Sequence, residues 1–251
     1  MCGRFTLSVN AQRLQEFFPL FEVPETQPRF NIAPTQMVLA VRQEENAQPQ
    51  ASLLRWGLIP SWAKDKKIGA SLINARADTV AVKAAFRAAF KRRRCLILAD
   101  GFYEWRRGEK KTAKQPFHIR LGDGRPFAIA GLWETWSNEQ PAIESCTIIT
   151  TEANDVVGQV HHRMPVILDP RDYARWLDPA NADPAVVQEM LRPYPPEQMA
   201  ATAVGTFVNN ARNEGSNCLA PSADLLQERA IGFEPTTSSL GNGPLADAIG
   251  T

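Results

Sequence analysis

The spacing of hydrophobic residues along the chain predicts short helices that alternate irregularly with short strands. A first helix is expected over residues 8–18, because Leu14, Phe17 and Phe18 fall on one side of it and Pro19 ends it. A second helix is expected to run from a cap at Asp78 or Thr79 to Phe90. Its apolar residues share one face: Val82, Phe86, Ala89 and Phe90. Two more short helices are expected at 169–170 and 183–184, where a capping Asp precedes a Pro.

Short apolar and β-branched runs predict the strands. They lie at 37–41, 52–56, 95–98, 102–106, 116–121, 127–133, 146–151, 164–168 and 204–208. A basic turn with a glycine follows the fourth of these and predicts a hairpin with the fifth. Because strands and helices do not alternate regularly, a parallel doubly wound sheet is disfavoured. The pattern instead predicts an α+β fold, with a mixed, largely antiparallel β core (a barrel-like or bifurcated sheet) flanked by short helices.

The domain organisation follows from a change in composition near the end of the chain. Residues 1–222 show no internal repeat and no linker, and we expect residues 1–227 to form one catalytic domain. From residue 228 Gly, Pro, Ser and Thr crowd together without a periodic apolar face. Such a segment buries too little surface to offset its ordering entropy, so 228–251 is expected to be a flexible tail.

Composition excludes several classes of protein. The four cysteines (Cys2, Cys95, Cys146, Cys218) are far apart and form no C-x-x-C pair, which argues against a zinc knuckle or a disulfide framework. Two of the three histidines, His161 and His162, are adjacent and would point to opposite faces of an extended segment. No apolar run approaches the roughly 18 residues that span a bilayer. We expect a cytoplasmic protein without metal, cofactor or membrane contact.

Positive charge is concentrated in one part of the chain. The net charge is +1, but residues 83–125 hold thirteen Lys or Arg against four Asp or Glu, which gives +9 there and −8 elsewhere. Such a segment, which includes the run 91–94, attracts phosphate backbones. A solvated basic hairpin explains the same run equally well.

The N-terminus carries the most reactive group of the chain. Removal of Met1 would leave Cys2 with a free α-amine beside its thiol. An α-amine has an unperturbed pKa of about 7.7–8.0, against about 10.4 for lysine, and is therefore more often neutral and nucleophilic. This amine can condense with an aldehyde to an imine, and the thiol can then close a thiazolidine ring. On its own, a cysteine at position 2 is a weak signal, and chance explains it more readily than this chemistry.

Several later segments are dense in polar and aromatic residues that loops rarely need for packing. They are Arg29-Phe30-Asn31-Ile32-Ala33-Pro34, Arg55-Trp56-Gly57-Leu58-Ile59-Pro60-Ser61-Trp62, Ile73-Asn74-Ala75-Arg76, Asp100-Gly101-Phe102-Tyr103-Glu104-Trp105 and His161-His162-Arg163-Met164-Pro165. In this order behind Met1-Cys2-Gly3-Arg4, they resemble the SOS-response-associated peptidase (SRAP) family from residue 1 to about 227. His162 stands where Asp is also common in that family, so His161 is the better match to the family's histidine.

The resemblance implies an abasic-site processing protein. Such a protein senses the lesion in single-stranded DNA and crosslinks itself to it through its N-terminal Cys. In this chain Cys2 would attack the ring-opened sugar, and Glu104, between two aromatic residues, would assist ring opening with a raised pKa. His161 would shuttle protons. The amide of Asn74 would hold the Cys2 amine or a sugar hydroxyl.

The same resemblance implies where DNA binds. Arg4, Arg76 and Arg163 would bind phosphates, and Thr150 would add a hydroxyl contact. Aromatic rings would stack on bases, at about 1–3 kcal/mol each. The candidates are Trp56, Trp62 and Trp105, whereas Trp133 and Trp176 are expected to be packing residues.

Three functions stay open at this point. The first is a covalent trap with lyase-like Schiff-base chemistry and an associated autopeptidase activity, acting as a monomer on abasic single-stranded DNA at the nucleoid. The second is a cysteine peptidase in which Cys2 is the nucleophile and His161 the base. The third is a non-covalent binding module for modified bases or single-stranded DNA, in which Cys2 only packs.

Overall fold

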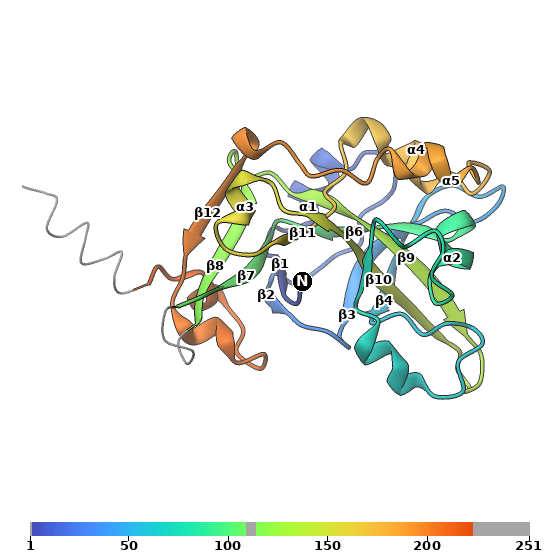
Figure 1. The fold of residues 1–251 in the computed structure, drawn as a ribbon, viewed down its shortest axis with the longest axis horizontal. Helices are drawn as coiled ribbons and strands as arrows, with labels where there is room; N and C mark the ends of the chain where they lie inside the picture. The colour runs from blue at the N-terminus through green and yellow to red at the C-terminus, as the bar shows by residue number, and fades with distance from the viewer. Residues whose placement is uncertain (1, 109–113, 223–251) are drawn as a thin grey trace, which may run out of the picture.

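The strands form two sheets that meet at the N-terminal strand. The computed structural model describes residues 2–108 and 114–222. Within them, one sheet has the order β12-β8-β7-β1-β2, and the other has the order β11-β10-β4-β3-β6-β9 with β5 also paired to β10. Figure 1 shows β1 between the strands β7 and β8 on one side and the larger sheet on the other. The fold is a single α+β domain, as the sequence predicts.

The larger sheet closes into a barrel. Its five ring strands are β3 (Met37–Arg42), β4 (Gln50–Trp56), β6 (Arg94–Ala99), β9 (Phe127–Trp136) and β10 (Ile143–Glu152). Strand β10 closes the ring because it pairs in parallel with β4 and in antiparallel with β9. Every residue of β6 is buried, and all but one of β9. The barrel interior is therefore the main core, and β10 carries two short strands on its flanks, β5 (Asn74–Arg76) and β11 (Arg163–Pro165).

The smaller sheet holds the N-terminus in place. It consists of β1 (Phe5–Leu7), β2 (Arg29–Ile32), β7 (Gly101–Arg107), β8 (Lys114–Leu121) and β12 (Met199–Ala203). β1 is paired in antiparallel with both β2 and β7. The Asp100 carboxylate accepts hydrogen bonds from the Thr6 hydroxyl (2.5 Å), from the Ser8 backbone N–H and hydroxyl (both 2.6 Å) and from the Val9 N–H (3.0 Å). These bonds fix the register of β1 against β7.

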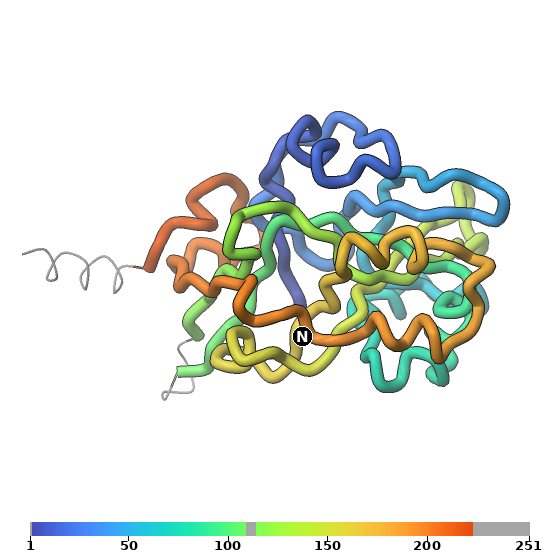
Figure 2. The backbone as a smooth tube through the Cα atoms, turned by 90° about the horizontal axis from the view of Figure 1, so that it is seen from above, coloured from blue at the N-terminus to red at the C-terminus, as the bar shows by residue number. Residues whose placement is uncertain are grey.

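Short helices cover the sheets. The α-helices are α1 (Ala11–Phe17), α2 (Arg87–Arg92), α3 (Asp155–Gly158), α4 (Tyr173–Leu177) and α5 (Pro184–Gln188), and the 3-10 helices are η1 (Lys66–Ser71), η2 (Pro170–Asp172), η3 (Pro196–Gln198), η4 (Thr206–Asn209) and η5 (Ser216–Leu219). The predicted caps Asp169 and Asp183 each accept a backbone N–H at the start of η2 and α5. Both views place residues 205–222, coloured orange to red, at the end of the molecule that carries β7 and β8 (Figures 1 and 2).

Two predicted elements are wrong. Residues 78–86 form successive turns rather than a helix, and α2 begins only at Arg87. Asp78 does not cap, because its carboxylate binds Arg76 and the Thr79 hydroxyl, and Val82 is 72% exposed. Residues 204–208 are not a strand: β12 precedes them at 199–203, and η4 begins at Thr206.

Four strands escape prediction. β1, β2 and β5 have three or four residues each and are too short to show a period. β12 lies just before the run at 204–208 where a strand was expected. Among the described residues, no helix is long and apolar enough to cross a membrane. The predicted tail at 228–251 lies outside the residues that the structure describes.

Candidate functional site

Cys2 lies where the two sheets meet. The Tyr103 N–H donates to the Arg4 carbonyl at 2.9 Å, which continues the β1–β7 pairing toward the N-terminus. From the barrel side, the Asn74 amide nitrogen donates to the Cys2 carbonyl at 2.8 Å. Cys2 is fully buried between these supports. The predicted removal of Met1 concerns a residue outside the described part of the chain.

Glu104 supplies an acid–base group beside Cys2. Its side chain is only 3% exposed, and this burial raises the pKa of its carboxyl to about 7. Burial, together with the charge of Glu104, also raises the pKa of the Cys2 thiol above its ordinary value. At neutral pH Glu104 is therefore divided between its acidic and basic forms, and the thiol keeps its proton.

His161 lies just before β11 and has a fixed ring. Its Nδ1 is 3.1 Å from the Arg163 N–H nitrogen and 3.2 Å from the Arg163 carbonyl oxygen. The pKa of its imidazole is lowered by burial first, with smaller contributions from His162 and Arg107, so the neutral form predominates at pH 7. The expectation that the two histidines point to opposite faces is wrong. They stand in a turn after α3, and their rings stack with centroids 4.4 Å apart.

Asn74 supports the backbone of Cys2, where we expected it to hold the amine or a sugar hydroxyl. The amide nitrogen is taken by the Cys2 carbonyl. The amide oxygen is buried and has no hydrogen-bond partner among the described residues. A buried acceptor of this kind can receive an N–H or O–H from a bound ligand or from the Cys2 amine.

Arg76 and Arg163 flank β10 at the end nearest this site. Arg76 stands opposite Thr150 on β5, and Arg163 stands opposite Glu152 on β11. The Arg163 Nη2 donates to the Thr150 carbonyl at 2.6 Å and to the Thr150 hydroxyl at 3.2 Å. Thr150 itself is 1% exposed in the protein without DNA, and its hydroxyl helps to orient Arg163. A direct phosphate contact of Thr150 stays a prediction.

Arg4 contacts β2, β7 and residues 205–222. Its Nη1 donates to the Asn31 side-chain oxygen at 2.5 Å and to the Val208 carbonyl at 3.0 Å. Its guanidinium carbon lies 5.7 Å from the ring centroid of Trp105, whose indole N–H donates to the Asn209 side chain at 2.7 Å. Phosphate binding by Arg4 and base stacking by Trp105 stay predictions.

The tryptophans divide by burial. Trp56 is fully buried, with its indole N–H on the Ile73 carbonyl at 2.9 Å, so the prediction that it stacks on bases is wrong. Trp62 is 61% exposed, and base stacking by this residue stays a prediction. Trp133 and Trp176 are buried, as predicted for packing residues.

Sequence reasoning assigned no functional role to two residues that organise the site. Asn31 is fully buried and its amide nitrogen reaches the carbonyls of Asn210 (3.0 Å) and Asn213 (2.7 Å), which ties β2 to the C-terminal segment. Asp78 was predicted only as a helix cap, yet it forms an ion pair with Arg76. From sequence, Asn31 stands out only as part of a motif segment, and its contacts depend on residues 210 and 213, far along the chain.

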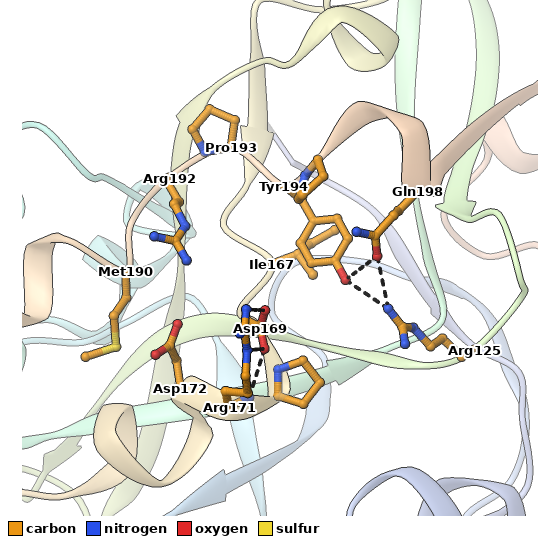
Figure 3. Close-up of a pocket in the computed structure, with 12 residues that line it drawn as sticks. Arg125, Ile167, Asp169, Arg171, Asp172, Met190, Arg192, Pro193, Tyr194 and Gln198 are labelled. Carbon is orange, nitrogen blue, oxygen red and sulfur yellow. Dashed lines mark hydrogen bonds and ion pairs between the residues drawn. The ribbon is translucent and has the colours of Figure 1, made fainter.

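A cavity of about 400 Å³ lies elsewhere, between η2 and the segment that leads into η3 (Figure 3). Its polar lining residues bind one another: Arg171 pairs with Asp169 at 2.8 Å, and the Arg125 Nη2 donates to the Tyr194 hydroxyl at 3.1 Å. No candidate catalytic or DNA-binding residue lines it. Within 2–108 and 114–222, no group of three or more His, Cys, Asp or Glu is placed to hold a metal ion.

The fold and the site together define a class of protein. A cysteine next to the N-terminus is buried beside a carboxyl of raised pKa, and two arginines flank a strand that ends nearby. Such an arrangement suits nucleophilic chemistry on an anionic ligand.

Comparison with known proteins identifies the family. The SOS response associated peptidase (SRAP) family matches residues 1–211, and the chain belongs to it. The chain is 44% identical over 226 residues to the abasic site processing protein YoaM of Bacillus subtilis, covering 87% of this chain and 97% of that protein. It is 30% identical over 265 residues to the abasic site processing protein HMCES of Gallus gallus, covering 88% and 78%.

Solved structures support the fold. A crystal structure of a protein from Bacteroides thetaiotaomicron has a TM-score of 0.74 at 22% identity and covers 88% of this chain and 100% of its own. One from Bordetella bronchiseptica has a TM-score of 0.67 at 27% identity and covers 81% of this chain and 100% of its own. The predicted family and the predicted fold class are both confirmed.

Proposed function

We propose that this protein senses abasic sites in single-stranded DNA and forms a covalent thiazolidine crosslink to them through Cys2 after removal of Met1. The observation that carries the proposal is the position of Cys2, fixed by Asn74 and buried beside Glu104. Relatives named abasic site processing proteins support the choice of substrate. The protein would act as a monomer in the cytoplasm, at the nucleoid.

The chemistry begins with the sugar. An abasic deoxyribose is mostly a closed hemiacetal. Glu104 in its protonated form gives a proton to the ring oxygen, while the anomeric hydroxyl loses one. The C1′ aldehyde that results is attacked by the Cys2 amine, and the carbinolamine loses water to leave an imine. Because the pKa of Glu104 is about 7, the same carboxyl can donate and accept protons at neutral pH.

Ring closure follows from the thiol. The Cys2 sulfur adds to the imine carbon, its proton passes to the imine nitrogen, and a five-membered thiazolidine results without further loss of atoms. The thiol enters as a neutral group, because burial raises its pKa. His161, neutral at pH 7, is the base that we assign to this proton and to reversal.

Replacement of Cys2 tests the proposal. We expect Cys2→Ala to bind abasic single-stranded DNA normally but to form only an imine, which survives denaturation only after borohydride reduction. Cys218→Ala is the matched control, since it removes another buried thiol and should crosslink like the unmodified protein. A heat-stable crosslink in Cys2→Ala without borohydride would disprove the thiazolidine.

The peptidase alternative is less well supported. Cysteine peptidases depend on a thiolate whose pKa is lowered by a neighbouring cation, whereas the pKa of Cys2 is raised by burial and by Glu104. If the protein were a peptidase, Cys2→Ala would lose peptide hydrolysis. If it were a non-covalent binding module, DNA binding by Cys2→Ala would be unchanged, and neither the variant nor the unmodified protein would crosslink. The same variant therefore separates all three functions.

A further inference from the structure

An acidic residue occupies the donors of a proposed phosphate-binding arginine. The Arg76 Nε donates to Asp78 Oδ1 at 3.1 Å, and the Arg76 Nη2 donates to Asp78 Oδ2 at 2.5 Å. Two parallel bonds of this kind are also how a guanidinium binds a phosphate. Both side chains are about half exposed, at 62% and 49%, so an incoming strand can reach them.

The same carboxylate also acts on Arg163. The hydrogen bond from Arg76 lowers the pKa of Asp78, and the charges of Arg76 and Arg163 act in the same direction. Arg163 is itself anchored on Thr150 through its Nη2. The carboxylate of Asp78 thus faces both cations that flank the end of β10, where a backbone phosphate would be expected to bind.

The backbone around Asp78 keeps the carboxylate there. The Ala77 N–H donates to the Thr150 carbonyl at 2.9 Å, and the N–H groups of Thr79 and Val80 donate to the Arg76 carbonyl at 3.1 and 2.8 Å. Val80 is fully buried. The main chain at Asp78 is therefore held in place, so its negative charge stays close to the arginine pair even when a phosphate displaces the carboxylate from Arg76.

We propose that Asp78 is a specificity-determining residue, which competes with backbone phosphates for Arg76 and Arg163 and so weakens reversible binding to intact single-stranded DNA. The protein then stays on DNA only after the covalent step at Cys2. Intact DNA cannot undergo this step, because it has no C1′ aldehyde. This inference rests on the proposed function, because it assumes that DNA phosphates reach the two arginines.

The test is the affinity for an intact single-stranded oligonucleotide, measured by fluorescence anisotropy. Asp78→Asn should bind about three- to fivefold more tightly at low salt, since an exposed ion pair no longer has to be displaced. The gain should shrink as salt rises, because exposed charges are screened. Glu22→Gln is the matched control: it removes an exposed acid in the α1–β2 connection and should change the affinity less than twofold.

A second variant separates competition from general repulsion. In an Arg76→Gln background, Asp78→Asn should improve binding less than twofold, because the donors that Asp78 directly binds are gone and only its weaker charge interaction with Arg163 remains. Equal or weaker binding by Asp78→Asn, an equal gain in Glu22→Gln, or a gain that persists in full without Arg76 would each overturn the proposal. If the unmodified protein neither bound single-stranded DNA nor crosslinked to abasic DNA, the proposed function itself would fail.

Discussion

Single residues at this site owe their chemistry to burial. Glu104 is placed on β7 by the pairing with β1, and desolvation there raises the pKa of its carboxyl to about 7. The sequence alone showed only its aromatic neighbours. The position of Cys2 beside Glu104 depends on two strands, β1 and β5, which are too short to be predicted from the sequence.

Glu104→Gln tests the role of this carboxyl in the reaction. Crosslinking at pH 7 should slow by about 10²–10⁴-fold, the usual contribution of one acid–base group, while binding of single-stranded DNA is unchanged. Single-turnover rates on abasic oligonucleotides measure the loss. An unchanged rate would remove Glu104 from the mechanism.

The same group predicts a pH dependence of stability. The folded pKa of about 7 lies above the unfolded value of about 4.3, so the folded state holds more protons between these two pH values. The free energy of unfolding should therefore fall as pH rises from about 4 through 7. In Glu104→Gln this part of the fall should disappear, and urea unfolding at pH 5 and pH 8 measures it.

At the level of elements, a buried arginine joins two helices to the barrel. Arg94, at the start of β6, donates to the carbonyls of Phe90 and Lys91 at the end of α2, and to those of Trp176 and Asp178 at the end of α4. Burial lowers the pKa of its guanidinium to about 10, which leaves it charged at neutral pH. The basic run 91–94 belongs to a segment whose charge was predicted to attract phosphate backbones. Arg94 is buried and bound to backbone carbonyls, so it is not available for such a contact.

Arg94→Met should destabilise the protein strongly. Several buried carbonyls lose their donor, at about 1–3 kcal/mol for each unsatisfied group, so we expect a loss of about 3 kcal/mol or more in the free energy of unfolding. Arg92→Met is the control. Arg92 is exposed, so its replacement should change the free energy of unfolding by no more than about 0.5 kcal/mol. Equal unfolding midpoints in urea would contradict this account of Arg94.

The absence of a side chain at Gly101 lets β7 lie close to His118 on β8 and Thr6 on β1. A Cβ at Gly101 would lie 2.0 Å from His118 Nε2 and 3.0 Å from the Thr6 hydroxyl, which Asp100 also binds. We expect Gly101→Ala to lower both the melting temperature and the crosslinking rate, because the register of β1 and hence the position of Cys2 depends on this contact. Gly158→Ala, where nothing lies within 4 Å, should leave both unchanged or stabilise α3 slightly.

At the scale of the whole molecule, the sequence predicts most of the barrel but not how the site is assembled. Runs such as 95–98 and 127–133 are predictable because every position is buried, and the expected strands form there. The prediction of a helix at 78–86 is wrong, because the sequence does not reveal that the Asp78 carboxylate accepts a hydrogen bond from Arg76 and is not available as a cap. The motifs pointed to Cys2, Asn74, Glu104 and His161, whereas the direction of each hydrogen bond depends on long-range pairing.

The most direct test of the central claim is mass spectrometry of the protein after reaction with an abasic single-stranded oligonucleotide and denaturing alkylation by iodoacetamide. Our account predicts an adduct that lacks Met1, has lost one water, and carries the oligonucleotide on Cys2 with its sulfur protected from alkylation. An adduct on a lysine, an adduct whose Cys2 thiol is alkylated, or a crosslinked chain that retains Met1 would contradict it.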